Sequence, residues 1–244
     1  MFLEVKDLAF HYEREPLIEG LSFGVEEGEF VSILGPSGCG KSTVLNLLAG
    51  ILRPEAGEIF LDGAPVRGMS PRLAYMPQND LLFPWKTIMQ NVCLHARLHG
   101  REDEARSRAK ALFPRFGLAG CEDAWPGALS GGMRQRAAFL RTALCDAELL
   151  LLDEPFGALD VITRGEMQDW LIDMRGSLGR TCLLVTHDID EAIYLSDRVL
   201  VLNGRPARIC RSLRVEARER SRDWLYEQKD LRRQLYEGIL GGGA

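Results

Sequence analysis

Glycines, a lysine and two hydroxyl side chains crowd into one short run of this sequence, GPSGCGKST. Its members are Gly35, Pro36, Ser37, Gly38, Cys39, Gly40, Lys41, Ser42 and Thr43. The backbone N–H groups of such a turn wrap a phosphate, and a helix that begins there adds partial positive charge. Lys41 is placed to reach the terminal phosphates of a nucleotide, and the Ser42 hydroxyl to ligate Mg²⁺. The run therefore predicts a nucleotide-binding site.

Two acidic residues end an apolar run in the second half of the chain. Asp153 and Glu154 close the stretch ELLLLDE, which places them at the carboxyl end of a buried strand, where open α/β sheets bind ligands. Asp153 is suited to hold the water shell of a metal ion, and Glu154 to polarise a water molecule for attack on the γ-phosphate. The solvated end of a strand is the alternative interpretation.

A histidine closes the next apolar run. His187 ends the stretch CLLVTH and should emerge at the same edge of the sheet as Asp153 and Glu154. A lone histidine is usually structural or solvated, but this position favours a hydrogen bond to the γ-phosphate.

A second glycine-rich run lies in LSGGMRQR, residues 129–136. Ser130 is a natural N-cap, and Gly131 and Gly132 open a helix behind it, so this run also presents backbone donors and a helix dipole to an anion. It lacks a lysine like Lys41 and has no metal ligands of its own. It must serve another ligand or the nucleotide of another copy of the chain.

The elements that position these residues follow from the spacing of apolar side chains. Short β-like runs occupy residues 2–63, and the last of them before the first glycine-rich run is Phe30–Leu34; a helix over Val44–Gly50 follows that run. ELLLLDE is apolar on both faces, as in the middle of a parallel sheet, and TCLLVTH repeats this pattern after the helix-like TRGEMQDWLIDM. The core is therefore predicted to be β-α-β.

The remaining segments are a helical insert, a hairpin and a tail. Residues 88–144 have helical spacing with a break at Trp125–Gly127, and RVLVLNGRPARIC indicates a hairpin about an Asn-Gly turn. From Arg211 onward, charged and aromatic residues at helical spacing predict a solvated amphipathic helix.

Composition excludes several classes of protein. The chain has 244 residues, 46% of them hydrophobic, and a net charge of −5 without long runs of like charge, so no electrostatic footprint for nucleic acid is present. The N-terminus lacks the pattern of a signal peptide, and no stretch approaches the ~20 apolar residues of a membrane helix. The cysteines show no Cys-x-x-Cys pair, which favours reduced cytoplasmic thiols; they are Cys39, Cys93, Cys121, Cys145, Cys182 and Cys210. Any membrane role is expected to come through a partner.

The order of these motifs resembles that of a known family. GPSGCGKST, Gln78, LSGGMRQR, LLLLDEP, GALD and the VTH that ends in His187 together resemble the nucleotide-binding subunit of ABC transporters, over nearly the whole chain. The resemblance implies an α/β P-loop NTPase fold: a RecA-like core with a parallel sheet, an antiparallel β lobe and a helical lobe. It implies one domain, in which residues 1–87 and 145–210 form the core with the β lobe, 88–144 the helical lobe and 211–244 a C-terminal helical tail.

The resemblance also assigns roles to single residues. Tyr12 matches the aromatic that stacks on adenine, with an ordinary edge-strand tyrosine as the alternative. Gln78 matches the glutamine that senses Mg²⁺ and the attacking water, and Asp160 the aspartate that communicates across a dimer; many relatives carry Ser where this chain has Gly157. In the family two copies pair head to tail, and the LSGG of one copy covers the γ-phosphate of ATP held by the other.

An apolar loop follows Gln78. Leu81–Trp85, in NDLLFPWKTIMQNV, is either tucked into the core or offered to a partner. In the family this region borders the groove that receives a coupling helix of the membrane permease. LLFPWKT, DEPFGALDVITR and THDIDEAIYLSDRV resemble importers for nitrate, sulfonates, taurine and related solutes.

The resemblance thus implies an ATPase subunit that energises a membrane importer, with ATP and Mg²⁺ as cofactors. Its expected partners are a second copy of itself, permease subunits that hold it at the cytoplasmic face of the inner or plasma membrane and, indirectly, a solute-binding protein. One alternative is a soluble ABC-type ATPase, although those relatives usually carry two cassettes or long coiled-coil insertions. A P-loop kinase is another, but it would leave LSGGMRQR unexplained.

Overall fold

The computed structural model describes residues 1–13, 15–217 and 219–241. The strands are β1 (Leu3–Tyr12), β2 (Glu15–Val25), β3 (Phe30–Leu34), β4 (Ala56–Leu61), β5 (Ala64–Pro65), β6 (Leu73–Met76), β7 (Leu149–Asp153), β8 (Thr181–Thr186), β9 (Arg198–Asn203) and β10 (Arg208–Arg214). The helices are α1 (Lys41–Leu48), α2 (Ile88–Val92), α3 (Leu94–Leu98), α4 (Glu102–Leu112), a 3₁₀ turn (Pro126–Ala128), α5 (Gly131–Ala143), α6 (Val161–Leu178), α7 (Ile189–Leu195), α8 (Arg222–Glu227) and α9 (Lys229–Leu240).

A six-stranded sheet forms the centre of the molecule, in the order β10-β9-β3-β8-β7-β6. All neighbouring pairs are parallel except β9 with β10, so the carboxyl ends of five strands meet at one edge. At that edge Leu34 pairs with Thr186, and Asp153 pairs with Val185. This register brings the segments that follow β3, β7 and β8 side by side.

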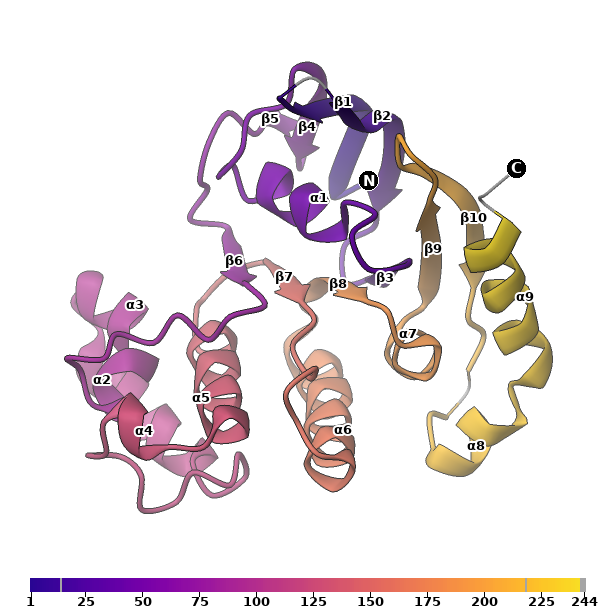
Figure 1. Cartoon of the computed structure of the whole chain (residues 1–244). Helices are drawn as coiled ribbons and strands as arrows, with labels where there is room; N and C mark the ends of the chain where they lie inside the picture. Colours follow the sequence, from indigo (N-terminus) through magenta and orange to yellow (C-terminus); the bar gives the residue numbers. More distant parts are fainter. Residues whose placement is uncertain (14, 218, 242–244) are drawn as a thin grey trace.

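Both faces of this sheet are covered, because its strands are apolar on both sides. In β7, Leu150 and Leu152 belong to a core shared with the helices α5, α6 and α7, whereas Leu149 and Leu151 belong to a core shared with α1 and the second sheet. The prediction of a central strand buried on both faces is confirmed. Figure 1 shows α1 on one side of the sheet and α5, α6 and α7 on the other.

The second sheet is antiparallel, in the order β2-β1-β4-β5, and lies over α1 (Figure 1). Leu8, Ile18 and Leu21 are fully buried against the same core as α1. The β-like runs of the first 63 residues are therefore strands, as predicted, and the glycine-rich run GPSGCGKST with α1 lies between them.

The helices α2–α5 lie together beyond β6 and form the helical lobe (Figure 1). The ring of Trp170 in α6 joins this lobe to the core, since its centroid lies 4.6 Å from that of Phe116 and 5.5 Å from that of Phe139. A 3₁₀ turn stands at the predicted break near Pro126. Among the described residues, none of the helices is long and apolar enough to cross a membrane.

The chain after β9 differs in part from the sequence-based expectation. The predicted hairpin forms, but β10 continues to Arg214, so the boundary drawn at residue 211 for a helical tail is wrong. Strand β10 pairs with β9 along this length, and this pairing overrides the helical spacing of the charges. Helices begin only at Arg222, as α8 and α9. In Figure 1 α9 lies beside β9 and β10, whereas α8 lies below them, toward α7. All six cysteines are described, and all are free thiols.

Candidate nucleotide site

The loop between β3 and α1 has a backbone that requires glycine. Gly40 has a φ of 102°, in the region that side chains rarely adopt. At Gly35 a Cβ atom would lie 2.3 Å from the carbonyl oxygen of Leu202, so the loop passes too close to the β9 strand for any side chain. The loop is therefore held in a tight turn at the carboxyl edge of the sheet.

The lysine of this loop is buried and faces the loop itself. Lys41 is 5% exposed, and its Nζ donates hydrogen bonds of 2.9 Å to the carbonyl oxygens of Gly35 and Pro36. Helix α1 begins at Lys41 without a side-chain cap from any described residue, so its first N–H groups remain available to an anion. This combination of a buried ammonium and an uncapped helix start fits a phosphate group.

A hydroxyl and a carboxylate stand beside the loop. Ser42 Oγ donates to Asp153 Oδ1 over 3.0 Å, and the Tyr75 hydroxyl lies 3.4 Å from Asp153 Oδ2. Burial raises the pKa of Asp153, and burial beside this carboxylate raises the pKa of Tyr75 as well. No cluster of three or more His, Cys, Asp or Glu side chains suited to a metal ion occurs in residues 1–13, 15–217 and 219–241. The Ser42 hydroxyl and the Asp153 carboxylate offer oxygen atoms, which fit Mg²⁺, an ion that keeps most of its ligands as water and phosphate oxygens.

Three polar side chains from neighbouring strand ends converge next to this pair. Glu154 Oε1 lies 3.1 Å from His187 Nδ1, and Gln78 Nε2 donates to Glu154 Oε2 over 3.3 Å. Glu154 has a φ of 46°, which is uncommon for a residue with a side chain and typical of functional sites. The structure thus brings together the three residues predicted to be catalytic.

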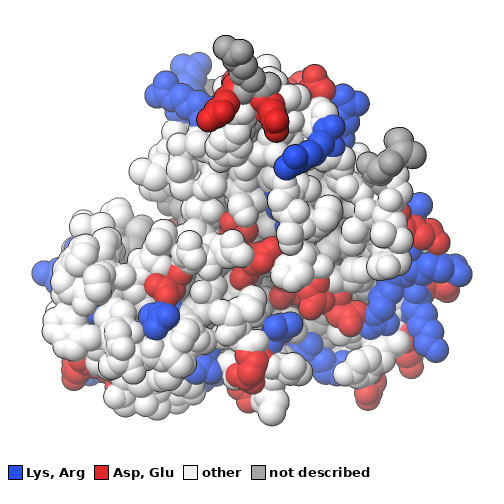
Figure 2. Space-filling view, in the orientation of Figure 1, with Lys and Arg blue, Asp and Glu red and all other residues white. Residues whose placement is uncertain are grey.

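An open cleft of about 430 Å³ lies at this edge of the sheet. Lys41, Gln78 and Glu154 are on its wall, and Tyr12 lies at its rim, 53% exposed, with its ring against Phe10 at 5.0 Å between centroids. Arg205, which follows β9, also lines the cleft and was not predicted; no motif in the sequence marks it. In Figure 2 acidic side chains run across the middle of the molecule, and Lys and Arg gather at the right-hand edge over α9.

The second glycine-rich run starts a helix as predicted. Ser130 Oγ accepts from Met133 N over 3.3 Å and caps α5, and both Ser130 and Gly131 are exposed. The described residues that line the cleft do not include Ser130, Gly131 or Gly132. This helix start is therefore displayed to the outside and does not complete the cleft of its own chain.

Asp160 caps another helix. Its carboxylate accepts from the N–H groups of Ile162 and Thr163, each at 3.1 Å, at the start of α6. The N–H of Thr163 is the main reason that the pKa of Asp160 lies below its ordinary value. Gly157 lies beside Glu154, because a Cβ there would be 3.6 Å from the Glu154 carbonyl oxygen. Between Glu154 and α6 the chain is thus a short turn with an exposed, charged end.

The apolar loop after Gln78 is divided between core and surface. Leu82 is buried, whereas Leu81 is 61% exposed and Trp85 is 65% exposed. The fully buried Asn91 shapes the loop: its side chain accepts from Phe83 N at 2.7 Å and donates to the carbonyl oxygen of Phe83 at 3.1 Å. Leu82 is therefore tucked into the core, whereas the contact of Leu81 and Trp85 with a partner stays a prediction.

The same loop is tied to the helix that begins at LSGG. Arg134 Nε donates to Asp80 Oδ2 over 3.0 Å, and Arg141 donates to the carbonyl oxygens of Asp80 and Leu81, both at 2.8 Å. Arg134 belongs to the LSGGMRQR run and Arg141 to no motif, but nothing in the sequence shows which loop either arginine contacts. They join the exposed loop to α5 on one side, while Gln78 joins it to the cleft on the other.

A buried carboxyl lies behind His187. Glu191, 6% exposed, receives a hydrogen bond from Gln168 Nε2 at 3.4 Å and one from the Thr186 hydroxyl. The Thr186 hydroxyl also accepts from Asp188 N at 3.0 Å, and Asp188 Oδ1 accepts from Glu191 N at 3.1 Å. Both neighbours of His187 in the chain are therefore bound to Glu191.

Glu191→Gln is expected to make the folded protein less sensitive to rising pH. Burial raises the pKa of the Glu191 carboxyl from 4.5 to about 7, so between these values the folded protein keeps a proton that the unfolded chain releases, and stability falls. At about 1.4 kcal/mol per pH unit, the loss reaches about 3 kcal/mol above the folded pKa. The glutamine does not ionise. Urea unfolding should therefore show the free energy of unfolding of the variant rising relative to that of the wild type between pH 4.5 and about pH 7. Parallel stability profiles would contradict this burial effect.

Comparison with known proteins places the site in context. The family model described as ABC transporter matches residues 18–157. The formylaminopyrimidine import ATP-binding protein ThiZ of Halalkalibacterium halodurans is 47% identical over 84% of this chain and 80% of its own length. The taurine import ATP-binding protein TauB of Yersinia pestis is 42% identical over 89% of this chain and 86% of its own length.

Solved structures agree with these relatives. The dimeric ATP-binding cassette MJ0796, in a post-hydrolysis state with ADP and Pi, superposes with a TM-score of 0.78 and 27% identity over 88% of this chain and 99% of that one. The protein cbiO1 of Clostridium perfringens, part of the ABC transporter complex cbiONQ, has a TM-score of 0.76 and 26% identity over 98% of both chains.

Proposed function

Because this chain belongs to the ABC transporter family, we propose that it is the ATP-hydrolysing subunit of a membrane importer for a small solute. The observation that carries the proposal is the meeting of Gln78, Glu154 and His187 at the edge of the sheet beside the Lys41 loop. A phosphate loop alone would fit any nucleotide-binding protein. A carboxylate held between an amide and an imidazole next to that loop fits hydrolysis of the terminal phosphate.

ATP is proposed to lie in the cleft with its adenine on Tyr12 and its phosphates on the loop from Gly35 to Thr43. The buried Lys41 ammonium and the start of α1 support this orientation. Ser42 and Asp153, with Gln78 nearby, would hold Mg²⁺, which neutralises phosphate charge when bound. The exposed ring of Tyr12 at the cleft rim supports its role as a stacking surface.

Hydrolysis then requires a water molecule between Glu154 and the γ-phosphate. Glu154 takes a proton from this water while the oxygen of the water bonds to the γ-phosphorus. The bond between the γ-phosphorus and the bridging oxygen breaks, and its electron pair stays on ADP. Gln78 orients the water, and His187 donates a hydrogen bond to the γ-phosphate. Their contacts with the Glu154 carboxylate support this assignment, since all three side chains can reach one point.

The exposed start of α5 is proposed to complete the site of a second copy of this chain. Ser130, Gly131 and Gly132 present N–H groups and a hydroxyl outward, as an anion-binding helix end does. Asp160 at the start of α6 would communicate between the two sites. ATP binding closes such a head-to-tail dimer, and hydrolysis reopens it.

The permease is proposed to dock on Leu81 and Trp85 and to hold the chain at the cytoplasmic face of the membrane. These side chains are exposed and apolar, and their loop is tied to Gln78 and to α5. Dimer closure would therefore move the docked permease between two orientations. The names of the relatives, one for taurine and one for formylaminopyrimidine, support a small organic solute. A nitrate, sulfonate or taurine type of solute is proposed, delivered to the permease by a separate solute-binding protein.

Charge substitutions in the exposed loop test the docking step. Leu81→Glu or Trp85→Glu places a carboxylate in an apolar contact, so the variant is expected to lose co-purification with its membrane subunits while its affinity for ATP is unchanged. Pull-down from detergent-solubilised membranes, with ATP affinity measured on the same sample, provides the readout.

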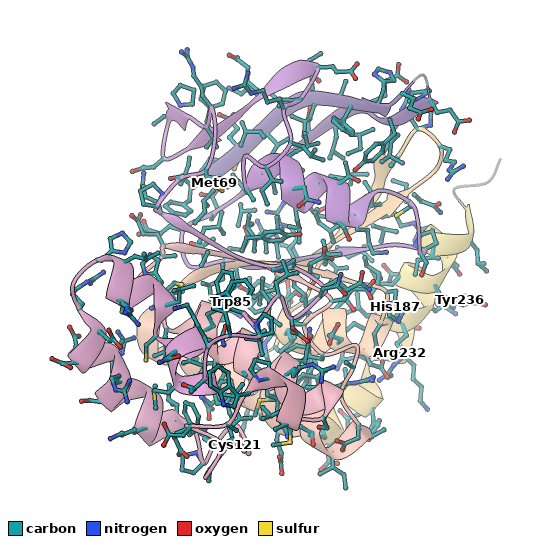
Figure 3. All side chains as sticks on the ribbon, turned by 60° about the vertical axis from the view of Figure 1, so that its left-hand side comes forward. Met69, Trp85, Cys121, His187, Arg232 and Tyr236 are labelled. Atoms are coloured by element: carbon teal, nitrogen blue, oxygen red, sulfur yellow. The ribbon has the colours of Figure 1, made fainter. Side chains whose placement is uncertain are left out.

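Met69→Glu is a matched control for this experiment. Met69 is 81% exposed and lies between β5 and β6, above Trp85 and toward the antiparallel sheet in Figure 3. It should co-purify as the wild type does. Recovery of the membrane subunits with Leu81→Glu and Trp85→Glu at the wild-type level would remove these residues from the docking surface.

A further inference from the structure

The segment that precedes α8 holds the end of the helix that follows His187. Arg220 has a side chain that is only 10% exposed. It donates to the carbonyl oxygens of Tyr194 and Ser196, both at 2.8 Å, and of Ile193 at 3.2 Å. These are groups that the C-terminal end of α7 leaves without helical partners. Arg220 therefore caps α7 from the tail.

Arg222, the first residue of α8, contacts the last turn of α7 and also the neighbouring helix α6. Its guanidinium lies 4.0 Å from the centroid of the Tyr194 ring, and it donates to Gln168 Oε1 over 2.9 Å. It also donates to Asp169 Oδ1 at 2.7 Å and to the carbonyl oxygen of Gly165 at 2.9 Å. One side chain thus bridges α6 and α7.

Arg232 in α9 reaches the first turn of α7. Its Nε donates to the Asp190 carboxylate, and its Nη2 donates to the carbonyl oxygen of Leu225 at 2.7 Å. Figure 3 shows Arg232 and Tyr236 close to His187, and all three border a cavity of about 630 Å³. The tail is therefore part of the surroundings of the histidine.

A continuous set of hydrogen bonds links Arg222 to the turn that carries His187. Gln168 accepts from Arg222 with its oxygen and donates to Glu191 Oε1 with its nitrogen. Glu191 in turn accepts from the Thr186 hydroxyl, which accepts from Asp188 N. Since Thr186 and Asp188 flank His187, this set of hydrogen bonds reaches the chain on both sides of the histidine.

We propose that the C-terminal tail positions His187 for hydrolysis, with Arg222 acting through Gln168 and Glu191 and Arg232 acting through Asp190. These are positioning residues, because they contact the helix behind the histidine and not the cleft. The proposal rests on the hydrolytic role proposed for the site above. It gives the tail a part in the reaction that its sequence, a run of charges at helical spacing, does not reveal.

The physical reason lies in the burial of the middle link. Gln168 is 5% exposed, so removal of Arg222 leaves its oxygen without its charged donor in a place that water reaches poorly. The amide is then free to turn, and its bond to Glu191 weakens. His187 would bind the same nucleotide less often in the reactive orientation, which lowers kcat and leaves ground-state binding almost unchanged.

The test compares Arg222→Ala with Arg233→Ala in the full chain. Arg233 is a matched control because it lies in the same tail, is 70% exposed and pairs with Asp230 of its own helix. ATP hydrolysis should show kcat lowered about tenfold in Arg222→Ala, with KM for ATP within about twofold of the wild type. Arg233→Ala should match the wild type. Assays well below the unfolding temperature of each variant separate this effect from lost stability.

A double variant decides whether the effect passes through Gln168. Gln168→Met keeps the volume of the side chain and removes both hydrogen bonds, so it should lower kcat to a similar extent. Adding Arg222→Ala to it should cause little further loss, since the path is already broken. Additive losses, or an Arg222→Ala variant with the kcat of Arg233→Ala, would overturn the proposal. A wild-type chain without ATP hydrolysis would instead count against the proposed function.

Discussion

Glu154→Gln is expected to bind ATP as the wild type does and to lose hydrolysis by about 10² or more. The glutamine keeps the shape of the side chain and its contact with Gln78 Nε2, but its amide cannot accept the proton of the attacking water. Nucleotide should therefore bind and the dimer should close, without the step that reopens it. Steady-state ATPase assays and size-exclusion chromatography with ATP measure the two effects, and dimers are expected to accumulate.

Glu148→Gln is the matched control for this substitution. Glu148 precedes β7, as Glu154 follows it, and its exposed carboxylate pairs with Arg72 on the surface. Loss of such an exposed pair should change activity by less than about twofold. Near-normal hydrolysis by Glu154→Gln would remove Glu154 from the role of base, whatever the control does.

A mixture of two inactive chains is expected to regain ATPase activity. Ser130→Arg disrupts the exposed start of α5 and leaves the phosphate-binding loop (residues 35–43, here called the cradle) intact. Lys41→Ala disrupts the cradle and leaves the start of α5 intact. In a head-to-tail heterodimer one site combines the two intact halves. For an equal mixture of freely exchanging chains, about half of the dimers are mixed, so activity should reach about a quarter of the wild-type level.

The controls are the two variants assayed alone, at the same total concentration. Loss of the Ser130 cap costs α5 about 1 kcal/mol, so thermal unfolding should show that Ser130→Arg is still folded at the assay temperature. Activity of the mixture at the level of the separate variants would show that Ser130 does not act on the nucleotide of a second copy.

The parts of the site that sequence predicts are those with local causes. The cradle needs glycine at Gly35, which lies close to the β9 backbone, and at Gly40, which has a positive φ. Both positions belong to the nine-residue motif GPSGCGKST, so the sequence alone indicates them. The places of Asp153, Glu154 and His187 follow from two strands that are apolar on both faces, because parallel strands bring their carboxyl ends to one edge. The N-cap at Ser130 is equally local.

The parts that sequence does not predict depend on contacts between distant segments. Arg222 contacts Gln168, and Arg141 contacts Asp80, across more than fifty residues of sequence. A single sequence does not indicate which residues so far apart come into contact. The end of β10 is set by its partner β9 and not by its own helical spacing. Likewise, the division of the apolar loop into a buried Leu82 and an exposed Trp85 depends on the amide of Asn91.

The outward-facing start of α5 also has a kinetic consequence. If the cradle and its cover come from different copies, hydrolysis in dilute solution is second order in the chain, and halving the concentration cuts the rate about fourfold when dimers are scarce. A permease that holds two copies makes the encounter intramolecular, at an effective concentration in the millimolar range. Chains that are not yet assembled would then hydrolyse little ATP. Hydrolysis would start only when the transporter is complete.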